Sequence, residues 1–111
     1  MFDMFKMMGR LGEIKEKIAQ VKASLNDIVL EESELDGVVT IEITAARIIK
    51  KIRTSPEFYE KYSVEEREAI LTEAVNNAFQ KAESKAKEVL QDEMKDIIPN
   101  IPGLDLGSLL S

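Results

Sequence analysis

The chain has 111 residues, with 15 Lys and Arg against 21 Asp and Glu, a formal net charge of −6, and neither cysteine nor histidine. This length suffices for one small domain. Without cysteine and histidine the chain has no disulfide framework, no thiolate nucleophile, and neither the commonest general base nor the commonest metal ligands. Most hydrolase, redox and metalloenzyme classes are thereby excluded, and we predict a protein that is not an enzyme and uses no cofactor or metal.

The first eight residues are largely apolar but do not match a signal peptide. Asp3 precedes any basic residue, Lys6 interrupts the apolar run, and no small-residue cleavage site follows. No apolar run reaches the roughly 18 to 20 residues that a membrane-spanning helix needs. We therefore expect a cytoplasmic protein that does not span a membrane.

A helix is predicted from about Phe2 to Asn26. Its apolar residues alternate at spacings of three and four, which is the heptad pattern of a helix with one apolar seam. These residues are Leu11, Ile14, Ile18, Val21, Leu25 and Ile28. The seam is flanked by basic residues, so an antiparallel partner or the acidic C-terminal helix suits it better than parallel self-pairing.

Three strands are predicted next. Val38–Thr44 alternates apolar and polar residues, as expected when one face of a sheet is buried. The preceding Asp36-Gly37 is a hairpin signal, which requires an incoming strand at Ile28–Glu34, an acidic segment suited to an exposed edge. The third strand, Ile48–Thr54, follows a tight turn at residues 44–47. We expect Ile48 and Ile52 on one face of it and Lys51 and Arg53 on the other.

Two further helices are predicted. Ser55-Pro56 is typical of a helix start, and Ser63 to Glu66 forms a capping box that opens a helix running to about Ile98. That helix is much longer than a strand, so its apolar overhang needs cover from the N-terminal helix and from a second chain. A row of alanines at 74, 78, 82 and 86 favours close approach of another helix. We expect an obligate homodimer with projecting helical arms, one domain over residues 1–98 and a flexible tail over 99–111.

Charge is distributed unevenly along the chain. Residues 27–36 carry five acids and no base, residues 37–54 carry four bases and one acid, and residues 55–111 carry six bases and twelve acids. An anionic partner is therefore expected to meet the N-terminal third or the cluster at 47–53. That cluster consists of Arg47, Lys50, Lys51 and Arg53.

Two interpretations of the basic residues stay open, a solvated face and a phosphate-binding surface. On the N-terminal helix, we place Lys6, Arg10, Lys17 and Lys22 along one side and Lys15 on another. Phosphate binding needs several bases on one concave surface, which a dimer with paired arms provides. No aromatic platform for stacking bases is present, so backbone contact is favoured over base reading. The acids at residues 31–36 do not have the spacing of a calcium loop, and no metal site is predicted.

The order of elements and several strings resemble the YbaB/EbfC family of bacterial nucleoid-associated proteins. The strings are MFDMFKMMGRLGEIKEKIAQVKASL, DGVVTIEITAARIIKKIR followed by SPEF, ILTEAVNNAFQKAESKAKE, and the closing IPGLDL. The resemblance covers nearly the whole chain. It implies an α+β fold of helix, three-stranded antiparallel sheet and long helix, in a tweezer-like homodimer whose strands join at the centre.

The resemblance also implies the site residues and the activity. The DNA-binding residues that it suggests are Lys6, Arg10, Lys15, Lys17, Lys22, Arg47, Lys81, Lys85 and Lys87. The turn usually written Asn-Gly in the family is Ala45-Ala46 here, and the net charge of −6 opposes tight DNA binding.

The expected function is duplex DNA binding in the nucleoid, through phosphate contacts with little sequence preference, affecting nucleoid organisation and gene expression. The alternative is a protein-interaction adaptor that uses the Met- and Phe-rich N-terminus and the arm cleft, without a DNA role.

Overall fold

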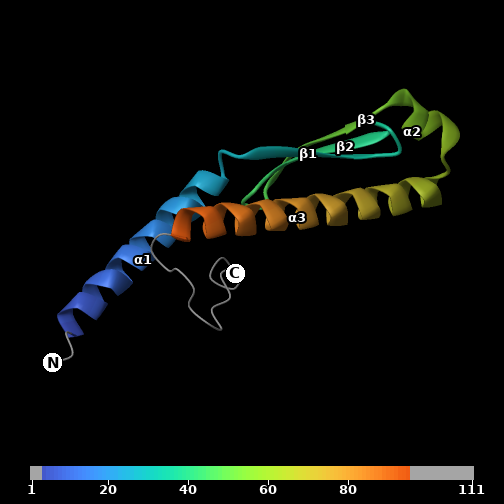
Figure 1. Cartoon of the computed structure of the whole chain (residues 1–111). Helices are drawn as coiled ribbons and strands as arrows, with labels where there is room; N and C mark the ends of the chain where they lie inside the picture. The colour runs from blue at the N-terminus through green and yellow to red at the C-terminus, as the bar shows by residue number, and fades with distance from the viewer. Residues whose placement is uncertain (1–3, 96–111) are drawn as a thin grey trace.

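A computed structural model describes residues 4–95, without the side chains of residues 4–8 and Arg10. In chain order the elements are α1 (Met4–Leu25), β1 (Val29–Glu34), β2 (Val39–Thr44), β3 (Ile49–Thr54), α2 (Pro56–Lys61) and α3 (Val64–Met94). The molecule is elongated, with extents of 73 × 25 × 17 Å. Figure 1 shows the sheet lying along one side of α3, with α1 beside the far end of that helix and projecting beyond it. The predicted α+β class and element order are confirmed.

The three strands form an antiparallel sheet in the order β1-β2-β3. β2 is central, and its residues Val39, Ile41 and Ile43 are buried against α3. In register, Glu32 of β1 and Ile52 of β3 lie on either side of Ile41. The predicted alternation of β2 is thereby confirmed, because a sheet with one covered face buries every second residue of a strand. The predicted incoming strand is also confirmed, as β1, which pairs with β2.

The β1–β2 turn lies where Asp36-Gly37 predicts it, but it is longer than a two-residue hairpin loop. Leu35, Asp36 and Gly37 all have positive φ, at 52°, 54° and 96°. The Gly37 and Val38 N–H groups both donate to the carbonyl of Glu34, at 3.2 and 3.1 Å. Leu35 and Asp36 have φ values near that of a left-handed helix, whereas the larger φ of Gly37 is one that residues with a side chain rarely adopt. This accounts for glycine at position 37.

The predicted facing of β3 was wrong at its first residue. Ile49, and not Ile48, pairs with Ile43 and packs against the sheet–helix core, while Ile48 is 53% exposed. The cause is an irregularity in the β2–β3 register between Glu42 and Ile43. A bulge of this kind adds one residue to one strand, so the side-chain alternation shifts by one position beyond it. The expected facing of Ile52 holds, since it pairs with Ile41.

Helix α3 begins at the predicted capping box. The Glu66 N–H donates to Ser63 Oγ at 3.2 Å, and the Ser63 N–H donates to Glu66 Oε1 at 2.9 Å. The helix ends at Met94, earlier than the expected Ile98, which lies outside the described residues. Its 31 residues span roughly 46 Å, against about 20 Å for a six-residue strand, so α3 overhangs the sheet as predicted.

The alanine row of α3 has a different partner from the one expected. Ala74, Ala78 and Ala82 are fully buried in the cluster formed with β2, and only Ala86 belongs to a cluster with α1. The small side chains therefore allow close approach of the sheet to α3, rather than of a second helix along the row. The reason is that β2 presents branched Val and Ile side chains, which fill the space that alanine leaves.

Helix α1 covers the overhanging end of α3. Val21 is buried together with Leu90 and Met94, with Ile14 and Ile18 packed against them. Lys17 Nζ lies 2.9 Å from Glu93 Oε2 beside this contact. The prediction that the apolar seam of α1 would meet the acidic C-terminal helix is thus confirmed. Within the described part of the chain, no helix is long and apolar enough to cross a membrane.

The capping box gives the stability of the protein a dependence on pH. The hydrogen bond from the Ser63 N–H lowers the pKa of Glu66 below its usual value of 4.5. A carboxyl whose pKa is lower when folded stabilises fully above its unfolded pKa, and this contribution is lost as the pH falls through the folded value. We therefore expect the thermal midpoint of wild type to exceed that of Glu66→Gln by less and less as the pH falls below 4.5. A difference that is constant with pH would contradict this linkage.

Candidate nucleic-acid interface

The basic residues predicted to bind DNA fall on three parts of the molecule. Five were predicted on α1, three on α3, and Arg47 in the β2–β3 turn. The side chains of Lys6 and Arg10 lie outside the described residues. The structure describes the side chains of the other predicted bases. They differ in whether a carboxylate of the same chain already pairs with them.

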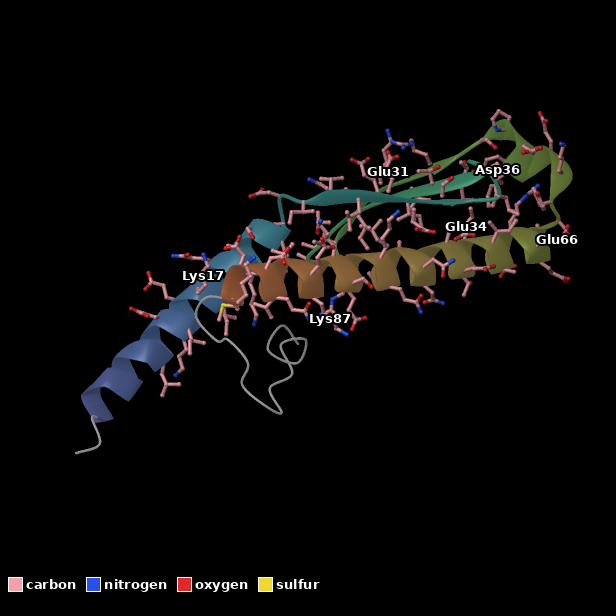
Figure 2. The ribbon with its side chains drawn as sticks, viewed as in Figure 1. Lys17, Glu31, Glu34, Asp36, Glu66 and Lys87 are labelled. Atoms are coloured by element: carbon pink, nitrogen blue, oxygen red, sulfur yellow. The ribbon has the colours of Figure 1, made fainter. Side chains whose placement is uncertain are left out.

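On α1 the structure separates Lys17 from Lys15 and Lys22. Lys17, labelled in Figure 2, pairs with Glu93 of α3 at 2.9 Å. Lys15 and Lys22 are exposed and seven residues apart, which places them on one face of the helix. The predicted grouping of Lys22 with Lys17 was therefore wrong, because it neglected the 140° that separates positions five residues apart at about 100° per residue.

The lysines of α3 are all engaged by acceptors of the same chain. Lys81 Nζ donates to the carbonyl of Glu31 at 2.7 Å and lies 3.6 Å from the carboxylate of Glu32. Lys85 and Lys87 pair along the helix, with Glu88 at 3.7 Å and Glu83 at 3.8 Å respectively. Lys87 lies on the side of α3 turned away from the sheet (Figure 2). Lys81 thus fastens β1 to α3, and the other two are partly neutralised.

Arg47 occupies an unusual backbone position in the β2–β3 turn. The Arg47 N–H donates to the carbonyl of Thr44 at 2.9 Å, and the Thr44 N–H donates to the carbonyl of Ile48 at 2.9 Å. Arg47 itself has a φ of 66°. A turn followed by a left-handed residue is a common hairpin connection whose last position favours glycine. An arginine there costs about 1 kcal/mol relative to residues that tolerate positive φ.

The β2–β3 turn lies against the C-terminal end of α1. Ala45 is buried in a cluster with Leu25 of α1 and Ala86 of α3. The Ala45 N–H donates to the carbonyl of Ile28, just after α1, at 2.9 Å. Lys22 precedes Leu25 by one helical turn, so the structure brings the end of the α1 lysine face and the turn of Arg47 to the same region.

Arg53 belongs to an ion-pair network on the uncovered face of the sheet. Its guanidinium lies 2.7 Å from Glu31 and 3.6 Å from Glu42, and the hydrogen bond with Glu31 raises the pKa of Arg53. By contrast, no described carboxylate oxygen lies within 4.0 Å of the charged group of several exposed bases. These bases are Lys15, Lys22, Arg47, Lys50 and Lys51.

Acidic side chains, among them the labelled Asp36 and Glu66, lie at the end of the sheet away from α1 (Figure 2). The β1–β2 turn, α2 and the first turns of α3 meet at this end (Figure 1). Helix α2 adds an ion pair between Glu57 and Lys61. Among residues whose side chains are described, no group of three acidic residues is arranged to hold a metal ion.

Comparison with known proteins places the whole described chain in one family. A family model described as the YbaB/EbfC DNA-binding family matches residues 1–97. The chain belongs to the YbaB/EbfC DNA-binding family. The resemblance drawn from the sequence strings is thereby confirmed.

Relatives agree with this membership, and a solved structure shares the fold. A nucleoid-associated protein of Flavobacterium johnsoniae is 32% identical over 103 residues, covering 93% of this chain and 95% of its own. One of Dictyoglomus turgidum is 31% identical over 100 residues, covering 90% and 95%. The crystal structure of an uncharacterized protein from Helicobacter pylori has a TM-score of 0.71 at 16% identity, covering 85% of this chain and 99% of that one. That structure shows that the YbaB/EbfC chain shares its fold.

Proposed function

We propose that this protein binds duplex DNA in the bacterial nucleoid as a homodimer, mainly through phosphate contacts and with little sequence preference. The observation that carries the proposal is the match to a DNA-binding family over residues 1–97. The names of the relatives as nucleoid-associated proteins support the location in the nucleoid, and an effect on nucleoid organisation and gene expression is part of the proposal. Exposed bases without a described acidic partner support contact with an anionic ligand.

The distribution of aromatic residues favours phosphate contact over base reading. Tyr59 is the aromatic residue most exposed among those described, at 59%, but it lies on α2 at the acidic end. Its ring is also occupied, because the Arg67 guanidinium lies 5.3 Å from the ring centroid and Phe58 packs against it edge-on. Phe79 packs against the sheet–helix core. The exposed bases therefore have no described aromatic neighbour on which a nucleotide base could stack.

Homodimer formation is supported by apolar residues left uncovered on and just before β3. β3 is an edge strand, and its residue Ile52 is 44% exposed although it faces the same side as the buried Ile41. Ile48, just before the start of β3, is also exposed. An exposed isoleucine on a free edge strand favours burial against a second copy, which would also bring the bases of two chains onto one ligand.

A titration against duplex DNA tests the proposal. Wild-type protein is titrated into a fluorescent duplex of about thirty base pairs over a series of salt concentrations. Binding should weaken linearly on a log–log plot, with a slope equivalent to several released counterions. Reversing the charge of Lys15 and Lys22 together should lower the affinity and reduce the slope, with an unchanged mass by light scattering. Absence of binding at low salt would overturn the proposal.

The homodimer is tested separately from DNA binding. Light scattering should give twice the 12.5 kDa of one chain for wild type. Placing a charge at the free edge, as Ile52→Asp, should shift the mass toward that of one chain, since a buried unpaired carboxylate opposes association. Thr72→Asp, an exposed substitution on α3, serves as the control and should stay dimeric. A wild-type mass of one chain at micromolar concentration would contradict the homodimer.

The adaptor alternative depends on residues 2–8, whose side chains are not described, so it stays a prediction. Removing these residues should abolish capture of a protein partner and spare DNA binding, if the adaptor is the function. The DNA titration on the same truncated chain distinguishes the two functions.

A further inference from the structure

We propose that DNA phosphates are contacted by a strip of bases on α1 and the β2–β3 turn, and not by the lysines of α3. The strip consists of Lys15, Lys22, Arg47 and Lys50, and we call it the α1–turn strip. This inference rests on the proposed function, because it specifies which surface performs it. It departs from the sequence-based expectation, in which the lysines of both helices bind DNA together.

Electrostatic pairing is the first reason for this choice. Lys81, Lys85 and Lys87 each lie within 3.6 to 3.8 Å of a carboxylate of their own chain, and Lys17 pairs with Glu93 at 2.9 Å. A phosphate that binds such a lysine must displace the carboxylate and leaves it near the DNA. The four bases of the strip have no described carboxylate within that range. They can exchange a mobile counterion for a phosphate directly, and this exchange drives association with DNA.

Contiguity is the second reason. Lys15 and Lys22 lie on one face of α1, about 10 Å apart along the axis. Leu25, one turn further on, is buried together with Ala45 of the turn that carries Arg47. Figure 1 shows this end of the sheet beside the C-terminal end of α1. Lys50 follows Arg47 by three residues at the irregular start of β3 and is exposed. The four bases therefore lie on two segments, distant in sequence, that meet where Leu25 packs on Ala45.

The backbone of Arg47 is the third reason. Its φ of 66° belongs to the left-handed region, which glycine and asparagine adopt more readily than arginine. The conformation therefore disfavours arginine at this position, and no described hydrogen bond or ion pair of its side chain compensates for it. A strained residue that the fold does not need is typical of a functional position. Phosphate contact gives the guanidinium such a role.

Substitution of Arg47 tests the proposal, because stability and affinity should move in opposite directions. Arg47→Gly and Arg47→Asn relieve the strained backbone, so we expect thermal midpoints equal to or above that of wild type. The same variants should bind a thirty-base-pair duplex about five- to tenfold more weakly at 0.1 M salt. The log–log salt slope should fall by about one for each lost contact. Lys22→Gln should weaken binding similarly.

Lys87→Gln is the matched control, since it removes one positive charge per chain without touching the strip. We expect its affinity and salt slope to lie close to those of wild type. Equal losses for the Arg47 and Lys87 variants would overturn the α1–turn strip, while leaving DNA binding itself intact. Failure of wild type to bind at low salt would instead overturn the proposed function, and the strip with it.

Discussion

Replacing Ile41 by alanine is expected to lower the free energy of unfolding by about 2 to 5 kcal/mol. Ile41 is fully buried at the centre of the middle strand, between the sheet and the alanine row of α3. Because Ala74, Ala78 and Ala82 are already small, α3 has few side-chain atoms with which to fill the resulting cavity. Most domains are stable by only about 5 to 15 kcal/mol, so this one change removes a large part of the total. Urea denaturation followed by circular dichroism measures the loss.

Val64→Ala provides the comparison for Ile41→Ala. Val64 begins α3 and is 63% exposed, so its truncation should change the free energy of unfolding by less than about 0.5 kcal/mol. A cost at Ile41 no larger than that at Val64 would contradict the described packing of β2 against α3.

Replacing Leu90 by alanine is expected to release α1 from α3. Leu90 is fully buried and packs with Val21 and Met94, in a cluster separate from the sheet–helix core. Its truncation should cost about 2 to 5 kcal/mol, and the loss should be local, because β2 packs elsewhere on α3. Hydrogen exchange should therefore accelerate in α1 while β2 stays protected. DNA affinity should fall as well, since α1, which carries Lys15 and Lys22, would no longer be held against α3.

Leu11→Ala is the matched control on the same apolar seam. Leu11 is 54% exposed, beyond the point where α1 packs on α3. The same chemical change should leave the exchange of α1 amides nearly unaltered. If Leu11→Ala accelerated exchange as much as Leu90→Ala, the seam would be buried along its whole length, for instance against a second chain.

Periodicity predicted most of the fold, because the two strongest patterns each reflect one buried surface. The alternation of Val39, Ile41 and Ile43 identified the central strand, and the heptad spacing of α1 identified the helix that packs on Leu90 and Met94. Periodicity did not predict the bulge that places Ile49, instead of Ile48, on the core-facing side of β3. A bulge depends on how two strands pair across the sheet, and the sequence of one strand does not record this.

The candidate site was less predictable than the fold. The sequence located the basic residues, but it did not show which ones already have acidic partners. Lys81 and Glu32 are 49 positions apart in the sequence, and they meet only because α3 packs against β1. The short-range pairs of Lys85 and Lys87, at spacings of three and four, could have been found from the sequence. The left-handed conformation of Arg47 could not, because the two alanines before it give no signal for a bulged turn.

The contact between α1 and α3 joins the beginning of the described chain to its end. During synthesis, α1 therefore has to wait for its partner helix. Val21 packs on Leu90, which is 69 positions later in the sequence. At a synthesis rate of about 5 to 20 residues per second, roughly 3 to 14 seconds pass between the two. During that time α1 is outside its final contact, and its apolar seam of Ile14, Ile18 and Val21 has no α3 to cover it. Of the described elements, α1 is therefore synthesised first, and its apolar seam stays open to other apolar surfaces until α3 has been made.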